Sequence, residues 1–529
     1  MLGSFSSTST ETNGVLAGKW SAYVIFTILG IGNLLPWNAF VTAAKYYGDQ
    51  FCDTPFESSF ESYFSMIYTL AQPFGLLLNI YYHSQITIQS LIFYPLIIYA
   101  LVFYIITALV ATPSIEPYAL FSITMLANFV CGVVGSIMNG GMFAMTGMLP
   151  SSYTAAIMNG QAAAGLIVAL VSTITVAVNP SSCGDDDDAD DGSCSHTNTL
   201  DYGALAYFIV ACITLTVCVW LYLVLIRLPF IAANMDRLAD TMRRTLSLNK
   251  RTLSIIQVAG HNPVHTDHAT EPTEHSSGVV KEPPMDKQNS KPAENLERSQ
   301  HDSKHVKISF SIMSVTHVVA AAAMAGMTTA SEQTDEGTAD EVFDLAHVTS
   351  VARTIIVPSY SVFIIFLGTL MVFPAIMVLI EPTHPCSQSR LYGDLWIPVM
   401  FVLLNAGDVI GRILAQIGSE NKYITPTNIH IHSTVRLAIP VLLLFCNIPD
   451  NHLDSAINTD GVVLLLIFLL GFSNGLLANL AMMFGPGLVS LPDAPLAGTI
   501  MMFWLNCGLL LGSALSFLWL YVVTGSVNG

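Results

Sequence analysis

The chain has 529 residues, of which 53% are hydrophobic and only 11% are charged. A soluble chain carries about a quarter charged residues, so this composition excludes a soluble globular protein and indicates a protein embedded in a lipid bilayer. The formal net charge of −18 argues against nucleic acid and anionic lipid surfaces as partners, because both are negatively charged.

Eleven apolar segments are long enough to cross a bilayer as helices, which takes about 20 residues each. They predict an all-α polytopic membrane protein with eleven transmembrane helices. Residues 1–17, ahead of the first segment, are polar and small and contain no cleavable apolar core, so we expect an N-terminal tail rather than a signal peptide. The segments cover residues 18–45, 62–83, 89–111, 117–148, 153–179, 203–228, 355–380, 391–418, 431–448, 460–484 and 495–524.

The first segment contains a proline, and polar side chains follow it. Pro36 frees a backbone carbonyl inside the helix, and Asn38 and Thr42 are placed where they can satisfy it. Trp37 has two interpretations. It is either a belt residue at the membrane interface or part of the wall of an internal cavity.

A long polar stretch at residues 229–350 separates the sixth and seventh segments. It mixes charges with His, Ser and Pro and holds few aromatic residues, so we expect it to be mostly disordered. It would divide the chain into an N-terminal bundle of six helices, residues 18–228, and a C-terminal bundle of five, residues 351–529. An apolar patch within residues 306–330 predicts a helix at the membrane surface, with a twelfth span as the alternative.

The basic residues predict the orientation. Twelve of the nineteen Lys and Arg residues lie between Arg227 and Lys307, and stretches rich in these residues stay in the cytoplasm. Six segments precede this stretch and five follow it, so we expect a cytoplasmic N-terminus and an external C-terminus. Cys183 and Cys194 then lie in an external loop, where a disulfide would persist, although their spacing does not establish that they meet. The N-terminal tail has no acidic dileucine signal, which favours the plasma membrane over an endomembrane.

The eighth segment places a carboxylate and a guanidinium inside a span. Ionised groups at this depth are costly, and they normally face a protein interior or a water-filled path, often as a pair. At about 100° per residue, the side chains of Phe401, Asn405, Asp408 and Arg412 share an arc of roughly 60°. This stripe is compatible with a structural salt bridge or with a polar site on a substrate path. In the ninth segment, Arg436 predicts a structural pairing with an acid.

Enzymatic motifs are absent from the sequence. It contains no His and Cys cluster with metal-ligand spacing, no phosphate-binding glycine loop and no nucleophile elbow. We therefore expect no cofactor, no metal and no enzymatic activity. Eleven segments also argue against a seven-helix receptor, and saturable uptake would exclude a channel.

Several strings recur at characteristic places in these segments. The first segment holds Pro-Trp-Asn-Ala-Phe-Val-Thr-Ala at residues 36–43, and the eighth holds Asn-x-x-Asp-x-x-Gly-Arg at residues 405–412. Further strings lie at residues 139–150, 152–165, 373–375, 472–486 and 497–512. In this order they closely resemble the signatures of the equilibrative nucleoside transporter family, solute carrier family 29. Each string alone is weakly specific, and the whole set is very specific.

The resemblance implies a six-plus-five arrangement, similar to the major facilitator fold without its last helix. In such a fold the two halves rock around a substrate at mid-membrane depth. It also implies transport of nucleosides through the lipid bilayer by alternating access. In most members this transport is facilitative, and some members also carry nucleobases. The alternative is a proton-coupled nucleoside or nucleobase carrier, with Asp408 as the protonatable group.

The resemblance also assigns site residues. Position by position, the family's substrate cavity maps onto Leu34, Trp37, Gln161, Phe373, Asn405, Asp408, Arg412 and Leu509. A thin external gate maps onto Val41 and Pro374, and Val41 departs from the bulkier Met of some members. The chemistry agrees, because the Gln161 amide can donate to and accept from a base, and Asp408 with Arg412 can bind ribose hydroxyls. Gln161 has a second interpretation as an interhelical hydrogen bond.

Overall fold

The computed structural model describes most of the predicted spans. Apart from one isolated bridge between Cys446 and Ile457, the described regular elements are helices. The side chains of residues 7–17, 36, 41, 42, 44, 45, 61, 62, 202 and 203 are not among those described. The described residues are 7–51, 54–56, 60–82, 85–112, 115–178, 202–235, 237, 344–384, 389–417, 423–449, 451–453 and 455–524.

The N-terminal half consists of seven described helices that pack in two linked groups. Within this half, α5 contacts α3 and α4, and α1 contacts α6 and α7. Their buried faces share an apolar core that includes Phe26, Leu76, Phe103, Phe143 and Phe208. The helices are α1 (Ser7–Thr42), α2 (Ala44–Gln50), α3 (Phe60–Tyr81), α4 (Ile88–Val110), α5 (Pro117–Gly147), α6 (Ser151–Val178) and α7 (Tyr202–Leu225).

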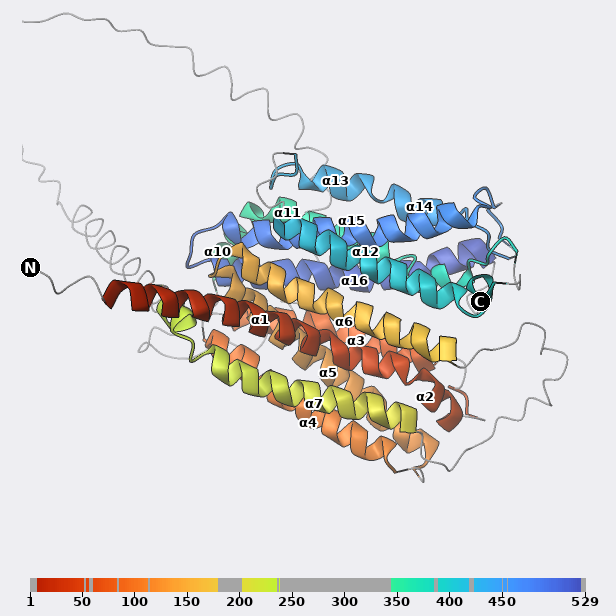
Figure 1. The fold of residues 1–529 in the computed structure, drawn as a ribbon, viewed down its shortest axis with the longest axis horizontal. Helices are drawn as coiled ribbons and strands as arrows, with labels where there is room; N and C mark the ends of the chain where they lie inside the picture. The colour runs from red at the N-terminus through yellow and green to blue at the C-terminus, as the bar shows by residue number, and fades with distance from the viewer. Residues whose placement is uncertain are drawn as a thin grey trace, which may run out of the picture. The chain divides into compact units, whose positions relative to one another are not determined.

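The C-terminal half is organised by two helix pairs, α12 with α15 and α11 with α16 (Figure 1). A second apolar core lies within this half and includes Met400, Leu443 and Ile467. The elements are α10 (Leu345–Thr354), α11 (Ile356–Leu370), η4 (Met377–Leu379), η5 (Arg390–Tyr392), α12 (Trp396–Ile417), α13 (Ile429–Val435), α14 (Ala438–Leu443), α15 (Asp460–Gly487) and α16 (Ala494–Thr524).

The described helices are consistent with the eleven predicted spans. Eight are long and apolar enough to cross a membrane, and α10 with α11 make a ninth candidate that is bent by 74°. The two other predicted segments correspond to α3 and to the shorter apolar helix Ile429–Leu443, which is made of α13 and α14. The prediction of a helical multi-pass membrane protein is therefore confirmed.

Prolines interrupt two of the spans that the sequence predicts as continuous. The predicted helix at 355–380 ends at Leu370, because Pro374 has no N–H to donate to the Leu370 carbonyl. Residues 371–380 form turns and η4, and the Phe373–Pro374 peptide bond is cis.

The second interruption lies in the predicted segment 431–448. Pro440 leaves the Arg436 carbonyl without its helical donor, and the N–H of Ile439 donates to that carbonyl instead, at 2.9 Å. This tighter turn separates α13 from α14.

Both ends of the polar insert differ from the prediction. The chain is helical at residues 229–235, and α10 already begins at Leu345. Asp344 caps α10, because its Oδ1 accepts from two N–H groups of the first turn. At the other end of the chain, α1 begins at Ser7, inside the predicted tail. The rest of the insert, including residues 306–330, lies outside the described residues, as do Cys183 and Cys194.

Helices α12 and α15 approach each other through four glycines, here called the glycine seam: Gly407, Gly411, Gly471 and Gly475. A Cβ atom added at any of them would lie under 3.0 Å from a backbone atom of the other helix, a distance that real Cβ atoms essentially never show. Small residues of this kind let the backbones of membrane helices come into direct contact. The seam therefore fixes how closely polar groups on the two helices can meet.

Candidate functional site

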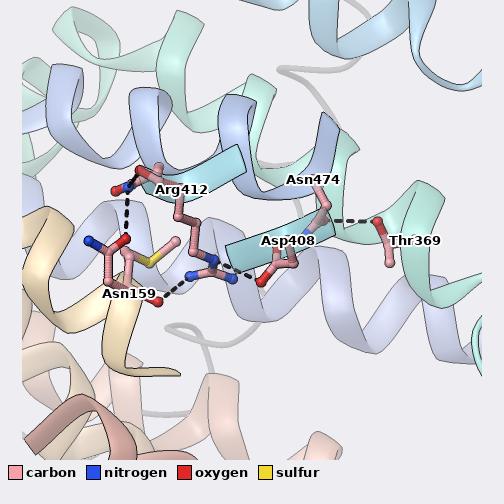
Figure 2. A network of polar contacts seen from close by, with 7 residues as sticks. Asn159, Thr369, Asp408, Arg412 and Asn474 are labelled. Carbon is pink, nitrogen blue, oxygen red and sulfur yellow. Dashed lines mark hydrogen bonds and ion pairs between the residues drawn. The ribbon is translucent and has the colours of Figure 1, made fainter. Parts of the chain in front are cut away.

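The carboxylate and the guanidinium of α12 form an ion pair one helical turn apart (Figure 2). Nε of Arg412 donates to Oδ2 of Asp408 at 2.8 Å. The Arg412 side chain is 6% exposed and that of Asp408 is 13% exposed. A pair so far from solvent is tolerated when further hydrogen bonds satisfy both ions, and both have them here.

The second oxygen of Asp408 binds a side chain of α15. Nδ2 of Asn474 donates to Oδ1 of Asp408 at 2.7 Å, and Oδ1 of Asn474 accepts from the Thr369 hydroxyl at 2.9 Å. Thr369 lies in the last turn of α11, and Asn474 lies between Gly471 and Gly475 of the glycine seam. The close approach of the two backbones therefore brings the Asn474 amide within reach of the carboxylate.

Arg412 reaches from α12 to the N-terminal half of the chain. Its Nη1 donates to the Met158 carbonyl of α6 at 2.7 Å. The Arg412 carbonyl in turn accepts from Nδ2 of Asn479 on α15, at 2.9 Å. One charged pair thus connects α6, α12 and α15.

A second polar contact between the halves involves α1, α6 and the end of α12. Oε1 of Gln416 accepts from the Tyr23 hydroxyl at 2.9 Å and from Nδ2 of Asn159 at 3.1 Å. The same amide of Asn159 lies 3.3 Å from the Tyr23 hydroxyl oxygen. The sequence analysis did not predict this cluster, because polar residues spaced singly along three helices give no local signal.

A third contact lies at the opposite end of α6. Arg390 donates through Nη1 to the Ala177 carbonyl and through Nη2 to the Val176 carbonyl, each at 3.0 Å. Its Nη2 also donates to Oδ2 of Asp394 at 2.6 Å, and this hydrogen bond raises the pKa of Arg390 above its ordinary value. A cation at the last carbonyls of a helix is also favoured by the helix dipole.

The predicted base-contacting residues lie on α1 and α6. The ring of Trp37 stacks on that of Tyr68 from α3, with 4.4 Å between ring centroids and 20° between ring planes. Nε2 of Gln161 donates to Oδ1 of Asn139 on α5, at 3.2 Å. Leu34 lies half-buried on α1. Gln161 thus makes the interhelical hydrogen bond that was one of its two interpretations.

The other predicted residues are divided between three elements. Phe373 packs edge-on against Phe401 with ring centroids 5.5 Å apart, and Pro374 beside it is exposed. Nδ2 of Asn405 donates to the Phe401 carbonyl at 2.9 Å, a hydrogen bond within α12. Leu509 is half-buried on α16.

The structure therefore joins only part of the predicted set directly. Asp408 and Arg412 bond each other, and Phe373 contacts the α12 stripe through Phe401. The side chain of the predicted gate residue Val41 lies outside those described. A pocket of about 280 Å³ lies between the middle of α1 and the first turn of α6 and contains none of the predicted site residues. It is lined by Lys19, Trp20, Tyr23, Ser152 and Tyr153.

Comparisons with known proteins agree with the resemblance found in the sequence. A family model described as Nucleoside transporter matches residues 125–521. Equilibrative nucleoside transporter 1 from Homo sapiens is 26% identical over 537 residues, covering 95% of this chain and 97% of the relative. Equilibrative nucleotide transporter 1 from Arabidopsis thaliana is 23% identical over 507 residues, covering 94% and 86%. A proton:xylose symporter of the major facilitator superfamily aligns with a TM-score of 0.49 and 12% identity, covering 95% of this chain and 88% of that one.

The matched residues begin in α5 and end in α16, so they include every helix that bonds to Asp408 or Arg412. The match also covers well over half of the chain, and the two relatives cover 95% and 94% of it. The chain belongs to the nucleoside transporter family.

Proposed function

We propose that this protein carries nucleosides across a membrane, down their concentration gradient, by alternating access. Members of its family are transporters and not enzymes, so the substrate leaves unchanged. The observation that carries the proposal is the Asp408–Arg412 pair, which lies where α12 meets the N-terminal half and has both charges fixed by hydrogen bonds.

Asp408 and Arg412 would bind the ribose. A carboxylate has about four lone-pair positions, and Asp408 uses two of them for Arg412 and Asn474. The free positions can accept hydrogen bonds from sugar hydroxyls, and such charge-assisted bonds are strong. Arg412 would contribute by fixing the carboxylate and by offering its positive charge to the hydroxyl oxygens.

The base would lie toward the N-terminal half. Trp37 offers an aromatic face and Gln161 an amide that can both donate and accept, once it exchanges its bond with Asn139. Leu34, Phe373, Asn405 and Leu509 would line the remaining walls, and Val41 with Pro374 would close the external side. Nucleobases, which share the flat ring but lack the sugar, are a further substrate class under this arrangement.

The same proposal assigns the larger parts of the chain. Residues 18–228 and 351–529 would be the two halves that rock about the substrate, joined by the insert at 229–350. The insert and the N-terminus would lie in the cytoplasm, the C-terminus outside, and the protein would work in the plasma membrane.

Proton coupling through Asp408 is disfavoured by hydrogen-bond chemistry. Both oxygens of this residue accept from donors, the guanidinium of Arg412 and the amide of Asn474. That arrangement suits a carboxylate, which only accepts hydrogen bonds. This supports the facilitative mode over a proton-coupled nucleoside or nucleobase carrier.

Exchange measurements in proteoliposomes test the proposal. Vesicles loaded with unlabelled uridine should take up labelled uridine saturably, reach equal concentrations on both sides, and respond little to an imposed pH gradient. Accumulation driven by the pH gradient would establish the proton-coupled carrier instead. Uptake that rises without saturation would indicate a channel.

A further inference from the structure

Arg436, at the break between α13 and α14, is a buried arginine with an unusual set of partners. It is 4% exposed, and the sequence predicts an acid beside it. In the described part of the chain its hydrogen bonds go to two carbonyls and two hydroxyls. Nη1 donates to the Ile365 carbonyl at 2.6 Å. Nη2 donates to the Leu470 carbonyl and to Oγ1 of Thr369, and Nε donates to Oγ of Ser473, each at 3.1 Å.

The arginine decides where the Thr369 hydroxyl points. Arginine can only donate, so Oγ1 of Thr369 accepts from Nη2, and its single proton is left for one acceptor. Two acceptors lie at 2.9 Å, the Ile365 carbonyl and Oδ1 of Asn474. The Ile365 carbonyl already accepts from Arg436 and, as a carbonyl inside α11, from the helical N–H four residues on, so both of its lone pairs are used and the hydroxyl proton is directed to Asn474.

The amide of Asn474 is then oriented from both sides. Its oxygen accepts from Thr369, and its nitrogen donates to Asp408. The reversed amide would place an oxygen against the Asp408 carboxylate, which has no proton to give. The hydrogen bonds therefore run in one direction, from Arg436 through Thr369 and Asn474 to Asp408 (Figure 2 shows the last three residues). This series of hydrogen bonds is here called the relay.

We propose that Arg436, Thr369 and Asn474 are positioning residues for the sugar. They hold the Asp408 carboxylate at one rotation and couple it to the segment that follows α11. The coupling is direct, since the Thr369 carbonyl accepts from the N–H of Phe373 at 3.0 Å. This inference rests on the proposed function, and it extends the sugar site from α12 to three further elements.

The test compares Thr369→Val, which keeps the shape but removes the hydroxyl, with Thr369→Ser, which keeps the hydroxyl. The matched control is Thr146→Val, because Thr146 is fully buried and, among the described residues, its hydroxyl bonds only within α5. Uptake of uridine, 3′-deoxyuridine and uracil is measured per transporter at the cell surface. Thr369→Val should raise the KM for uridine about three- to ten-fold, with a smaller rise for the other two and little change in maximal rate. Thr369→Ser and Thr146→Val should resemble wild type.

A double mutant separates positioning from general stability. In an Asp408→Asn background, Thr369→Val should cause no further loss of uridine preference, because the relay acts only through that carboxylate. The inference would be overturned if the effects of the two substitutions on uridine uptake were additive, or if Thr369→Val lowered the uptake of all three substrates equally. It would also be overturned if Thr369→Ser were as impaired as Thr369→Val. Wild-type protein without saturable uridine uptake would instead remove the function on which the relay rests.

Asn474→Asp gives an independent readout if Thr369→Val folds poorly. The new carboxylate would face Asp408, with Arg412 and Arg436 as the other charges nearby, and it has no proton to donate when ionised. On mild acidification it gains one, so uridine uptake by this variant should recover relative to wild type at the same pH. A variant with the same pH profile as wild type would contradict the relay.

Discussion

Replacing Asp408 by Asn tests the sugar site most directly. The carboxylate accepts at 2.8 Å from Arg412 and at 2.7 Å from Asn474, and an amide offers only one oxygen to these two donors. Whichever way the new amide turns, its NH₂ group faces a donor. Asp408→Asn also loses the charge-assisted bond to a ribose hydroxyl, which is worth roughly 1.5–3 kcal/mol, or about ten- to a hundred-fold in affinity.

The loss should depend on the sugar. Uptake of uridine should fall most, that of 2′-deoxyuridine and 3′-deoxyuridine less, and that of uracil least, because these compounds already lack one or both hydroxyl partners. The assay is initial uptake of each labelled compound, divided by the amount of transporter at the surface measured by biotinylation. That normalisation matters, because Arg412 loses its counter-charge and some folded protein will be lost with it.

A uniform loss across the four compounds would refute the argument and leave Asp408 as a structural lock. The charge-swapped pair is a weak control for that lock, for a reason visible in the structure. An acid at position 412 would place its oxygens against the Met158 carbonyl, which Arg412 now satisfies at 2.7 Å. The series of sugars is therefore the decisive comparison.

Three further predictions concern other parts of the molecule. Gln161→Leu should lower the uptake of purine and pyrimidine nucleosides unequally if the amide contacts the base. Equal losses of uptake together with poor folding would show that the Gln161 amide only joins helices. Gly475→Ala places a Cβ against the backbone at Asp408 and should cost about 1–3 kcal/mol or more in stability, measured as a lower melting temperature of the purified protein. Gly461→Ala is its control, with nothing within 4 Å of the added atom, and an equal shift in both would refute the packing argument. An epitope placed at Ser276 should bind antibody only after the plasma membrane is permeabilised, and binding to intact cells would reverse the assigned orientation.

Local patterns predicted much of this structure. The apolar segments located the helices, and the shared stripe on α12 identified Asp408 and Arg412, because a helical period needs only the neighbouring residues. The break after α11 was not predicted, although Pro374 supplies its cause, because hydropathy alone treats the region as one apolar run.

The partners of the charged residues could not be predicted in the same way. Asn474 lies in a string that the family resemblance covers, but nothing local shows that its amide meets a carboxylate of α12. The seam of glycines that brings them together depends on two helices far apart in sequence. Arg436 makes no direct ion pair within the described part of the chain; carbonyls of α11 and α15 accept its hydrogen bonds, and the acid that acts on it electrostatically is Asp408.

The boundary between α6 and the α12 region is closed at two levels in this structure. Gln416 holds Asn159 and Arg412 holds the adjacent Met158 toward one end of α6, and Arg390 holds the last carbonyls at the other end. A cell keeps a voltage across its membrane, and each elementary charge that crosses 100 mV releases about 2.3 kcal/mol. A water-filled path open at both levels would let ions dissipate that voltage. If the contacts open in turn, at least one stays closed, and a nucleoside can cross without an electrical leak.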